Sequence, residues 1–127
     1  MSKKTVKKIL VIDNDEYSLL LISDFLIFNN FQAIAAANGN LGLQLAREQK
    51  PDLIICDINM PGPNGYEVLR QLRRDPATAN IILLFLTFET DIASRRQALQ
   101  LGANGYLSKP VDLNELLSAI ATLLQSN

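Results

Sequence analysis

Histidine and tryptophan are absent from this sequence of 127 residues, and cysteine occurs once. Without histidine, the chain cannot supply a Ser-His-Asp triad, a histidine metal site or a phosphohistidine of its own. The single cysteine, Cys56, excludes an internal disulfide and any cysteine-based zinc cluster. Chemistry in this chain must therefore come from carboxylates, amides, hydroxyls and lysine.

A surplus of charge and long apolar segments are also lacking. Twelve Lys and Arg against thirteen Asp and Glu give a formal net charge of -1, so nothing points to a nucleic-acid or membrane surface. The apolar stretches at 9–12 and 81–86 are far shorter than the ~20 residues that span a bilayer, and the start lacks a signal peptide's apolar core. Lys3, Lys4, Lys7 and Lys8 are expected to form a solvated N-terminus. The sequence predicts a soluble, cytoplasmic protein that binds neither nucleic acid nor membrane directly.

The length and composition fit one globular domain. We expect a single domain over 1–127, with its core at about 7–124. Apolar residues make up 48% of the chain, which suffices for a hydrophobic core in a domain of this size.

Short apolar blocks alternate with segments of helical periodicity. The predicted strands are 7–13, 31–36, 53–56, 81–86 and, more weakly, 104–107. The last helical segment, 113–124, has i, i+3, i+4, i+7 apolar spacing, with Asp112 as its N-cap. Segment 90–101 is only weakly amphipathic, and Gly102 ends it as a C-cap glycine would. The alternation predicts parallel βαβ units, hence an α/β three-layer sandwich.

Polar residues directly follow four of the predicted strands. They are Asp13, Asn14 and Asp15 after the first strand, Asp57 after the third, Thr87 at the end of the fourth and Lys109 after the fifth. These carboxyl ends share the edge where open α/β sheets bind ligands. Each residue alone could be a helix cap or turn residue, but together their carboxylate and amide oxygens suit Mg²⁺. A hydroxyl and an ammonium opposite them can bind a phosphoryl group, which predicts phosphate chemistry with a carboxylate nucleophile.

These residues resemble the receiver domains of two-component response regulators. The resemblance covers 8 to about 124 and rests on four motifs in order: Ile12-Asp13-Asn14-Asp15, Asp57-Ile-Asn-Met-Pro-Gly-Pro-Asn-Gly65, Leu86-Thr87 and Lys109-Pro110. It implies a flavodoxin-like fold with a five-stranded parallel sheet in the order 2-1-3-4-5 and five helices.

The resemblance also implies the site residues. Asp57 would be the phosphoryl acceptor, while Thr87 and Lys109 would contact the phosphoryl oxygens, and the Lys109-Pro110 bond would be cis. The implied ligands of the Mg²⁺ cofactor are Asp13, Asn14, Asp57 and the backbone carbonyl of Asn59. Asn14 stands where the family usually has a second acid, and this departure bears on metal affinity.

The implied switch couples Thr87 to Tyr106, whose ring would rotate inward as Thr87 moves toward the phosphoryl group. The alternative is that Tyr106 packs on the last strand with its hydroxyl in water. Asn59, Phe88 and Glu89 would govern access to the acceptor and the lifetime of the phosphorylated form. Phe88 stands where the family usually has Ala or Gly, and this departure bears on access.

The resemblance implies a phosphorylation-controlled signalling switch whose only catalysis is self-catalysed phosphotransfer and autodephosphorylation. Because the chain has no histidine, the donor must be a separate histidine kinase or histidine phosphotransfer protein. No output domain follows Leu124, so we expect the surface of the fourth helix, fifth strand and fifth helix to contact an unknown output protein. A homodimer that forms on phosphorylation is compatible with the same resemblance.

Two other interpretations compete with this one. Asp13-x-Asp15, Thr87 and Lys109 also resemble the leading motifs of haloacid-dehalogenase-type phosphohydrolases, with Asp13 as nucleophile. That interpretation leaves Asp57 to Gly65 unexplained and lacks both a cap domain and a second acidic pair. The other is a receiver-shaped interaction module that takes no phosphate. The two departures favour it, and the presence of Asp57, Thr87 and Lys109 opposes it.

Overall fold

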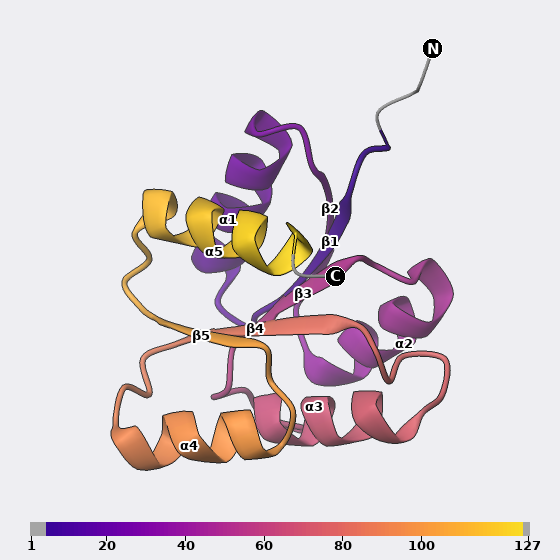
Figure 1. Ribbon diagram of the computed structural model, residues 1–127, viewed down its shortest axis with the longest axis vertical. Coiled ribbons are helices and arrows are strands. Elements are labelled where there is room, and N and C mark those ends of the chain that lie inside the picture. The colour runs from indigo at the N-terminus through magenta and orange to yellow at the C-terminus, as the bar shows by residue number, and fades with distance from the viewer. Residues whose placement is uncertain (1–4, 126–127) are drawn as a thin grey trace.

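A computed structural model of the protein, which describes residues 5–125, contains one parallel sheet covered by helices on both faces (Figure 1). The strands are β1 (Lys8–Ile12), β2 (Gln32–Ala36), β3 (Leu53–Cys56), β4 (Ile82–Thr87) and β5 (Gly105–Ser108). The helices are α1 (Glu16–Phe28), α2 (Gly39–Gln49), α3 (Gly65–Arg74), α4 (Ile92–Gln100) and α5 (Leu113–Gln125). The strand order β2-β1-β3-β4-β5 confirms the predicted fold. Of the basic N-terminus, Lys3 and Lys4 lie outside the described residues.

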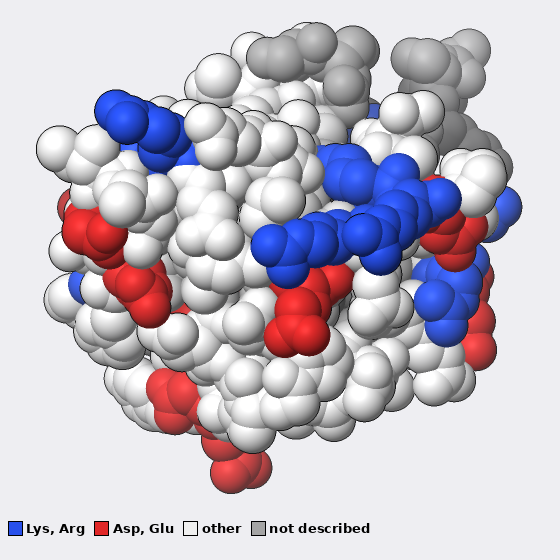
Figure 2. Space-filling view, turned by 90° about the horizontal axis from the view of Figure 1, so that it is seen from below, with Lys and Arg blue, Asp and Glu red and all other residues white. Residues whose placement is uncertain are grey.

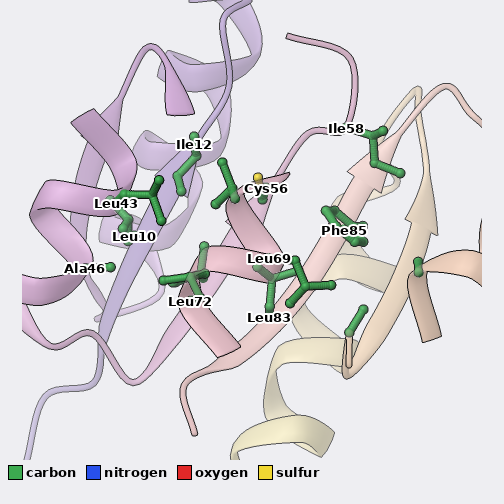
Figure 3. Close-up of a cluster of buried hydrophobic side chains, with 14 of the residues drawn as sticks. Leu10, Ile12, Leu43, Ala46, Cys56, Ile58, Leu69, Leu72, Leu83 and Phe85 are labelled. Carbon is green, nitrogen blue, oxygen red and sulfur yellow. The ribbon is translucent and has the colours of Figure 1, made fainter. Parts of the chain in front are cut away.

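The sheet separates two apolar cores because its central strands are buried on both faces. Every residue of β3 and β4 is buried, as expected for strands with helices above and below. Side chains on one face pack against α1 and α5, and those on the other pack against α2, α3 and α4. Figure 3 shows the second core, in which Leu69 and Leu72 of α3 meet Leu83 and Phe85 of β4. Because successive side chains of a strand point to opposite faces, the strand residues fill these two cores. The polar residues that follow the strands lie at the edge of the sheet.

Side-chain caps begin the helices close to where the sequence predicts them. Asp15 accepts a hydrogen bond from the Ser18 amide at 3.3 Å and starts α1. Asp112 accepts hydrogen bonds from the Asn114 and Glu115 amides at 3.0 and 3.1 Å, which confirms it as the cap of α5. These local bonds orient the loops that carry the polar residues of the sheet edge.

The α4 helix has the weakest helical pattern in the sequence. It begins at Ile92 because the Asp91 side chain accepts a hydrogen bond from the Ser94 amide at 3.2 Å. It ends at Gln100, and Gly102 follows with a φ of 103°, which confirms the predicted C-cap glycine. Ala98 is its one buried residue. This shallow packing explains the weak amphipathicity of the segment.

Strand register brings distant polar residues to one edge of the sheet. Ile12 pairs with Cys56, so Asp13 and Asp57 follow neighbouring strand ends, and the Asp57 amide donates to the Ile12 carbonyl at 3.0 Å. At the ends of the neighbouring strands β4 and β5, the Lys109 amide donates to the Thr87 carbonyl at 2.8 Å. Four residues that lie far apart in the sequence therefore meet at the carboxyl ends of β1, β3, β4 and β5.

Candidate functional site

Two buried carboxylates share one buried ammonium at the carboxyl edge of the sheet. The Lys109 Nζ donates to Asp13 Oδ2 at 2.7 Å and to Asp57 Oδ2 at 3.5 Å. The other oxygens are also engaged: Asp13 Oδ1 accepts from the Asp15 amide at 2.9 Å, and Asp57 Oδ1 accepts from the Ile58 amide at 2.7 Å. The structure thus brings together three of the predicted site residues, with Lys109 closer to Asp13 than to Asp57.

The charges of this cluster do not balance. Asp13, Asp57 and Lys109 are each less than a tenth exposed, so two anionic groups and one cation lie in a poorly solvated space. Burial raises the pKa of Asp13, while the hydrogen bond from Lys109 opposes that rise. A site with one uncompensated negative charge favours a further cation, and its oxygen donors suit a hard one such as Mg²⁺.

The other predicted metal ligands lie at the rim of this cluster. Asn14 is exposed, and the carbonyl of Asn59 accepts no hydrogen bond from residues 5–125. The Asp15 carboxylate is already engaged, since it accepts the hydroxyl of Ser18 at 2.7 Å. Among the described residues, no three Asp, Glu, Cys or His side chains are grouped to hold a metal ion. At this edge of the described chain, Asp13 and Asp57 are thus the two carboxylates that do not cap a helix, and Asn14 would offer an amide oxygen in place of a third.

Thr87 lies at the end of β4 and is fully buried. Its hydroxyl oxygen accepts a hydrogen bond from the Glu89 amide at 3.2 Å and donates to no group in the described part of the chain. The hydroxyl hydrogen can therefore be donated to an incoming oxygen. The Glu89 side chain accepts from the Ser94 hydroxyl at 3.1 Å, so this contact ties it to α4.

Tyr106 of β5 is turned into the molecule and is 8% exposed. Its hydroxyl donates a hydrogen bond to the Glu89 carbonyl, and its ring meets the edge of Phe85 with centroids 6.3 Å apart. Burial, with lesser contributions from nearby anionic groups, raises the pKa of its phenol to about 12. The alternative that leaves this hydroxyl in water is wrong for the structure described here. Through Glu89, Tyr106 and Thr87 contact the same short loop.

Phe88 points outward and is 68% exposed. Its ring centroid lies 5.6 Å from the Lys109 Nζ, within the range of a cation–π contact. The ring also borders a pocket of about 340 Å³ between the start of α1 and the loops after β4 and β5, where Tyr17 and Pro110 lie. Phe88 therefore covers the outer side of Lys109.

The backbone around Asp57 requires a glycine eight residues later. A Cβ atom at Gly65 would lie 2.4 Å from the Asp57 carbonyl oxygen and 2.7 Å from the Ile58 Cα. Only glycine permits this close approach. Cys56 is fully buried in the apolar core (Figure 3), and burial raises the pKa of its thiol, so it packs as an apolar side chain. The peptide bond between Lys109 and Pro110 is cis, as the resemblance implies.

Sequence reasoning missed two residues around Tyr106. The guanidinium of Arg95 lies 5.3 Å from the centroid of the Tyr106 ring. On the other side of Phe85, Tyr66 meets that ring edge-on and donates a hydrogen bond to the Ser94 carbonyl at 3.4 Å. No motif marks either residue, since both contacts join elements that are separate in the sequence.

Comparisons with known proteins agree with this geometry. Residues 9–121 match the family described as response regulator receiver domain. Protein PilH of Pseudomonas aeruginosa is 35% identical over 117 residues, which are 92% of this chain and 97% of that protein. The probable transcriptional regulator ycf29 of Pyropia yezoensis is 41% identical over 117 residues, or 92% of this chain and 53% of the relative. The chain thus spans nearly all of the first relative and about half of the second.

A solved structure shows the same architecture. The chemotaxis protein CheY4 of Vibrio cholerae superimposes with a TM-score of 0.89 at 28% sequence identity, covering 93% of this chain and 98% of that one. Within residues 5–125, no helix is long and apolar enough to cross a membrane.

Proposed function

Because the chain belongs to the family of response regulator receiver domains, we propose that Asp57 accepts a phosphoryl group from the phosphohistidine of a histidine kinase or phosphotransfer protein. The observation that carries this proposal is the position of the Asp57 carboxylate, buried at the sheet edge with Oδ2 3.5 Å from the Lys109 Nζ. Residues 1–127 contain no histidine, so the phosphohistidine of the donor lies outside this sequence. We propose a single receiver domain over 1–127 for this role.

The transfer itself needs a nucleophile and groups that stabilise charge. A carboxylate oxygen of Asp57 attacks the phosphorus, the bond from phosphorus to the donor's imidazole nitrogen breaks, and that nitrogen keeps the bonding electron pair. The Lys109 ammonium and the Thr87 hydroxyl would then bind oxygens of the transferred group. The free hydroxyl hydrogen of Thr87 supports this role. In autodephosphorylation a water molecule attacks the same phosphorus, the bond from phosphorus to the Asp57 oxygen breaks, and inorganic phosphate leaves as the Asp57 carboxylate is restored.

Mg²⁺ is the proposed cofactor of this site. Asp13, Asp57, the Asn14 amide oxygen and the Asn59 carbonyl would hold it, and when bound it neutralises charge on the phosphoryl oxygens. The uncompensated charge of the two carboxylates supports this fit. Lys109 is shared between Asp13 and Asp57 in this structure, so its ammonium can shift toward Asp57 as the balance of charge changes.

Replacing Asn14 by aspartate should tighten Mg²⁺ binding by somewhat less than tenfold. Two unit charges 4 Å apart attract each other by roughly 4 kcal/mol at an effective dielectric of 20, and a divalent cation attracts a carboxylate by about twice that. Desolvation and repulsion from Asp13 and Asp57 oppose most of that gain, which leaves about 1 kcal/mol. Asp15→Asn is the matched control, because Asp15 caps α1 and an asparagine can keep that cap. Mg²⁺ titrations followed by amide NMR check this; weaker binding by Asp15→Asn with no gain from Asn14→Asp would make Asp15 the ligand.

Phe88→Ala should accelerate labelling of Asp57 by acetyl phosphate several-fold. The Phe88 ring lies over the outer side of Lys109, so its removal should open the approach of a small donor and of water. Phe28→Ala is the control, since Phe28 is also an exposed aromatic residue but lies at the end of α1. Initial rates of phosphate incorporation measure the effect. Equal or slower labelling of a folded Phe88→Ala variant would reject the steric role.

We further propose that phosphorylation is transmitted through Thr87 and Tyr106 to the face formed by α4, β5 and α5. Support comes from Glu89, whose backbone amide donates to the Thr87 hydroxyl and whose carbonyl accepts from the Tyr106 hydroxyl. A displacement of Thr87 toward the phosphoryl group would move this loop and change the contacts of Tyr106 with α4. That face would then bind an output protein or, in a homodimer, a second phosphorylated copy.

Beryllofluoride, which mimics an aspartyl phosphate, tests the site and the switch together. Addition of beryllofluoride with Mg²⁺ should shift the amide NMR signals around Asp57, Thr87 and Lys109, and also those of Tyr106 and α4. Shifts confined to the site would support phosphorylation and reject the proposed switch. No shift at the site would reject the phosphoacceptor function itself.

A further inference from the structure

Three aromatic rings from different elements form a row that runs from α3 to β5. Tyr66 of α3 meets Phe85 of β4 with ring centroids 5.9 Å apart and ring planes inclined by 70°. Phe85 in turn meets Tyr106 of β5 at 6.3 Å with the same inclination. Edge-to-face contacts of this kind stabilise the position of each ring beyond the burial of its surface. We call these three residues the aromatic row.

Both ends of the aromatic row are attached to the segment that joins β4 to α4. The Tyr106 hydroxyl donates to the Glu89 carbonyl, and the Tyr66 hydroxyl donates to the Ser94 carbonyl at 3.4 Å. The Ser94 hydroxyl donates to the Glu89 carboxylate at 3.1 Å, so the two attachment points are also bonded to each other. The row and this segment therefore form a closed circuit of contacts, in which displacement of one ring disturbs the contacts of the other.

The middle ring, Phe85, is fully buried and lies against the backbone at the start of α3. A Cβ atom at Gly65 would come within 2.8 Å of its Cε1 atom. Tyr66, the next residue, packs against the ring from the same helix. A smaller side chain at position 66 would leave space into which the Phe85 ring can turn, and the ring would then lose its contact with Tyr106.

Contacts other than ion pairs attach α3 to α4. Figure 2, seen from the side of α3 and α4, shows Lys and Arg side chains gathered in a band across part of that face. The ion pairs that form within residues 5–125 are those of the Lys109 ammonium at the sheet edge, so none joins α3 to α4. The Tyr66 hydroxyl, by contrast, links the two helices directly. Salt should therefore screen little of this attachment.

We propose that Tyr66 is a positioning residue of the switch: its ring holds Phe85 in place, and Phe85 holds the Tyr106 ring in its inward position. This inference rests on the proposed function, because it adds a residue of α3 to the switch of Thr87 and Tyr106. Inward Tyr106 is the arrangement that phosphorylation of Asp57 would favour. By linkage, Tyr66 then raises the affinity of the Asp57 site for a phosphoryl group.

The ring of Tyr66, more than its hydroxyl, should carry this role. A distance of 3.4 Å is long for a bond from a hydroxyl to a carbonyl, whereas the centroid distance of 5.9 Å to Phe85 is ordinary for an edge-to-face pair. Tyr66→Phe keeps the ring and removes the hydroxyl, and Tyr66→Leu removes the ring. The two variants therefore separate the effect of the ring from the loss of one hydrogen bond.

Photochemically induced nuclear polarisation tests the position of Tyr106 directly, because it enhances the NMR signals of solvent-exposed tyrosine, tryptophan and histidine rings. This sequence has three tyrosines and neither of the other two residue types. Both Tyr66 variants keep only Tyr17 and Tyr106, and Tyr17, which is 73% exposed, serves as the internal reference. The Tyr106 signal should stay hidden in Tyr66→Phe and should appear in Tyr66→Leu.

Titration with beryllofluoride and Mg²⁺ tests the linkage to the phosphorylated form. Tyr66→Leu should weaken the apparent affinity by about two- to tenfold, whereas Tyr66→Phe should bind like the wild type. Leu45→Ala is the structural control, because Leu45 is a partly buried residue of α2 that packs on the same core; it should lower stability without changing either readout. In a Tyr106→Leu background, Tyr66→Leu should have no further effect on affinity, since the residue through which it acts is gone.

A Tyr106 signal that stays hidden in folded Tyr66→Leu, or that appears in Tyr66→Phe as well, would overturn the proposal. Equal weakening by Leu45→Ala, or additive losses of affinity in the double variant, would also overturn it, because Tyr66 would then act through stability alone or through other residues. The polarisation measurement needs no phosphoryl analogue. A failure of Asp57 to bind beryllofluoride is therefore recognised separately from a failure of Tyr66 to position Tyr106.

Discussion

The Asp57→Asn variant is expected to incorporate no phosphate from acetyl phosphate or from a phosphohistidine donor. An amide oxygen is a poor nucleophile, and the Asp57 carboxylate lies 3.5 Å from the Lys109 Nζ at the edge where Thr87 ends β4. Measurement of acid-labile phosphate, or of the mass of the intact protein, checks this. Retained phosphate at the wild-type level would mean that another carboxylate, above all Asp13, is the acceptor.

The fold should survive this substitution. The asparagine oxygen can still accept the Ile58 amide, and Lys109 keeps its 2.7 Å contact with Asp13. Asp15→Asn is the control, because Asp15 lies at the same sheet edge but is exposed and caps α1. This variant should incorporate phosphate as the wild type does. Matching circular dichroism spectra and denaturation midpoints of the three proteins would show that the loss of labelling reflects chemistry alone.

Arg73→Met should lower the free energy of unfolding by about 2–4 kcal/mol. The Arg73 guanidinium donates to the carbonyls of Ala79, Ile81 and Gly102 and to the Asn104 side chain, at 2.8 to 3.2 Å. It thereby joins the loop before β4 to the loop before β5. Methionine keeps part of the apolar stem's packing but leaves these acceptors without a donor, and such acceptors cost free energy where water cannot reach them.

Arg74→Met is the matched control for Arg73→Met. Arg74 is the next residue of α3, is exposed and forms no ion pair with the described residues, so its replacement should change stability by less than about 0.5 kcal/mol. Urea denaturation of both variants and the wild type gives the comparison. Equal stability of the two variants would show that water satisfies the carbonyls as well as Arg73 does.

The sequence alone determined the architecture of this protein and the positions of its polar edge. Apolar blocks and helix-period segments are local patterns, and their alternation allows few topologies once crossovers are right-handed. Asp15, Asp112 and Gly102 act at helix ends through groups within a few residues, so their roles could be predicted from neighbours. Asp57, Thr87 and Lys109 were predicted to meet because each follows or ends a strand of the same sheet.

Only the tertiary structure decided how those side chains are paired. Lys109 lies closer to Asp13 than to Asp57, and Arg95 covers Tyr106, across separations that no local pattern encodes. Arg73 and Arg74 are neighbours of the same type, yet one is half-buried among carbonyls and the other is exposed. The physical reason is that side-chain contacts depend on the packing of elements against each other, whereas periodicity and capping depend on the chain's own backbone.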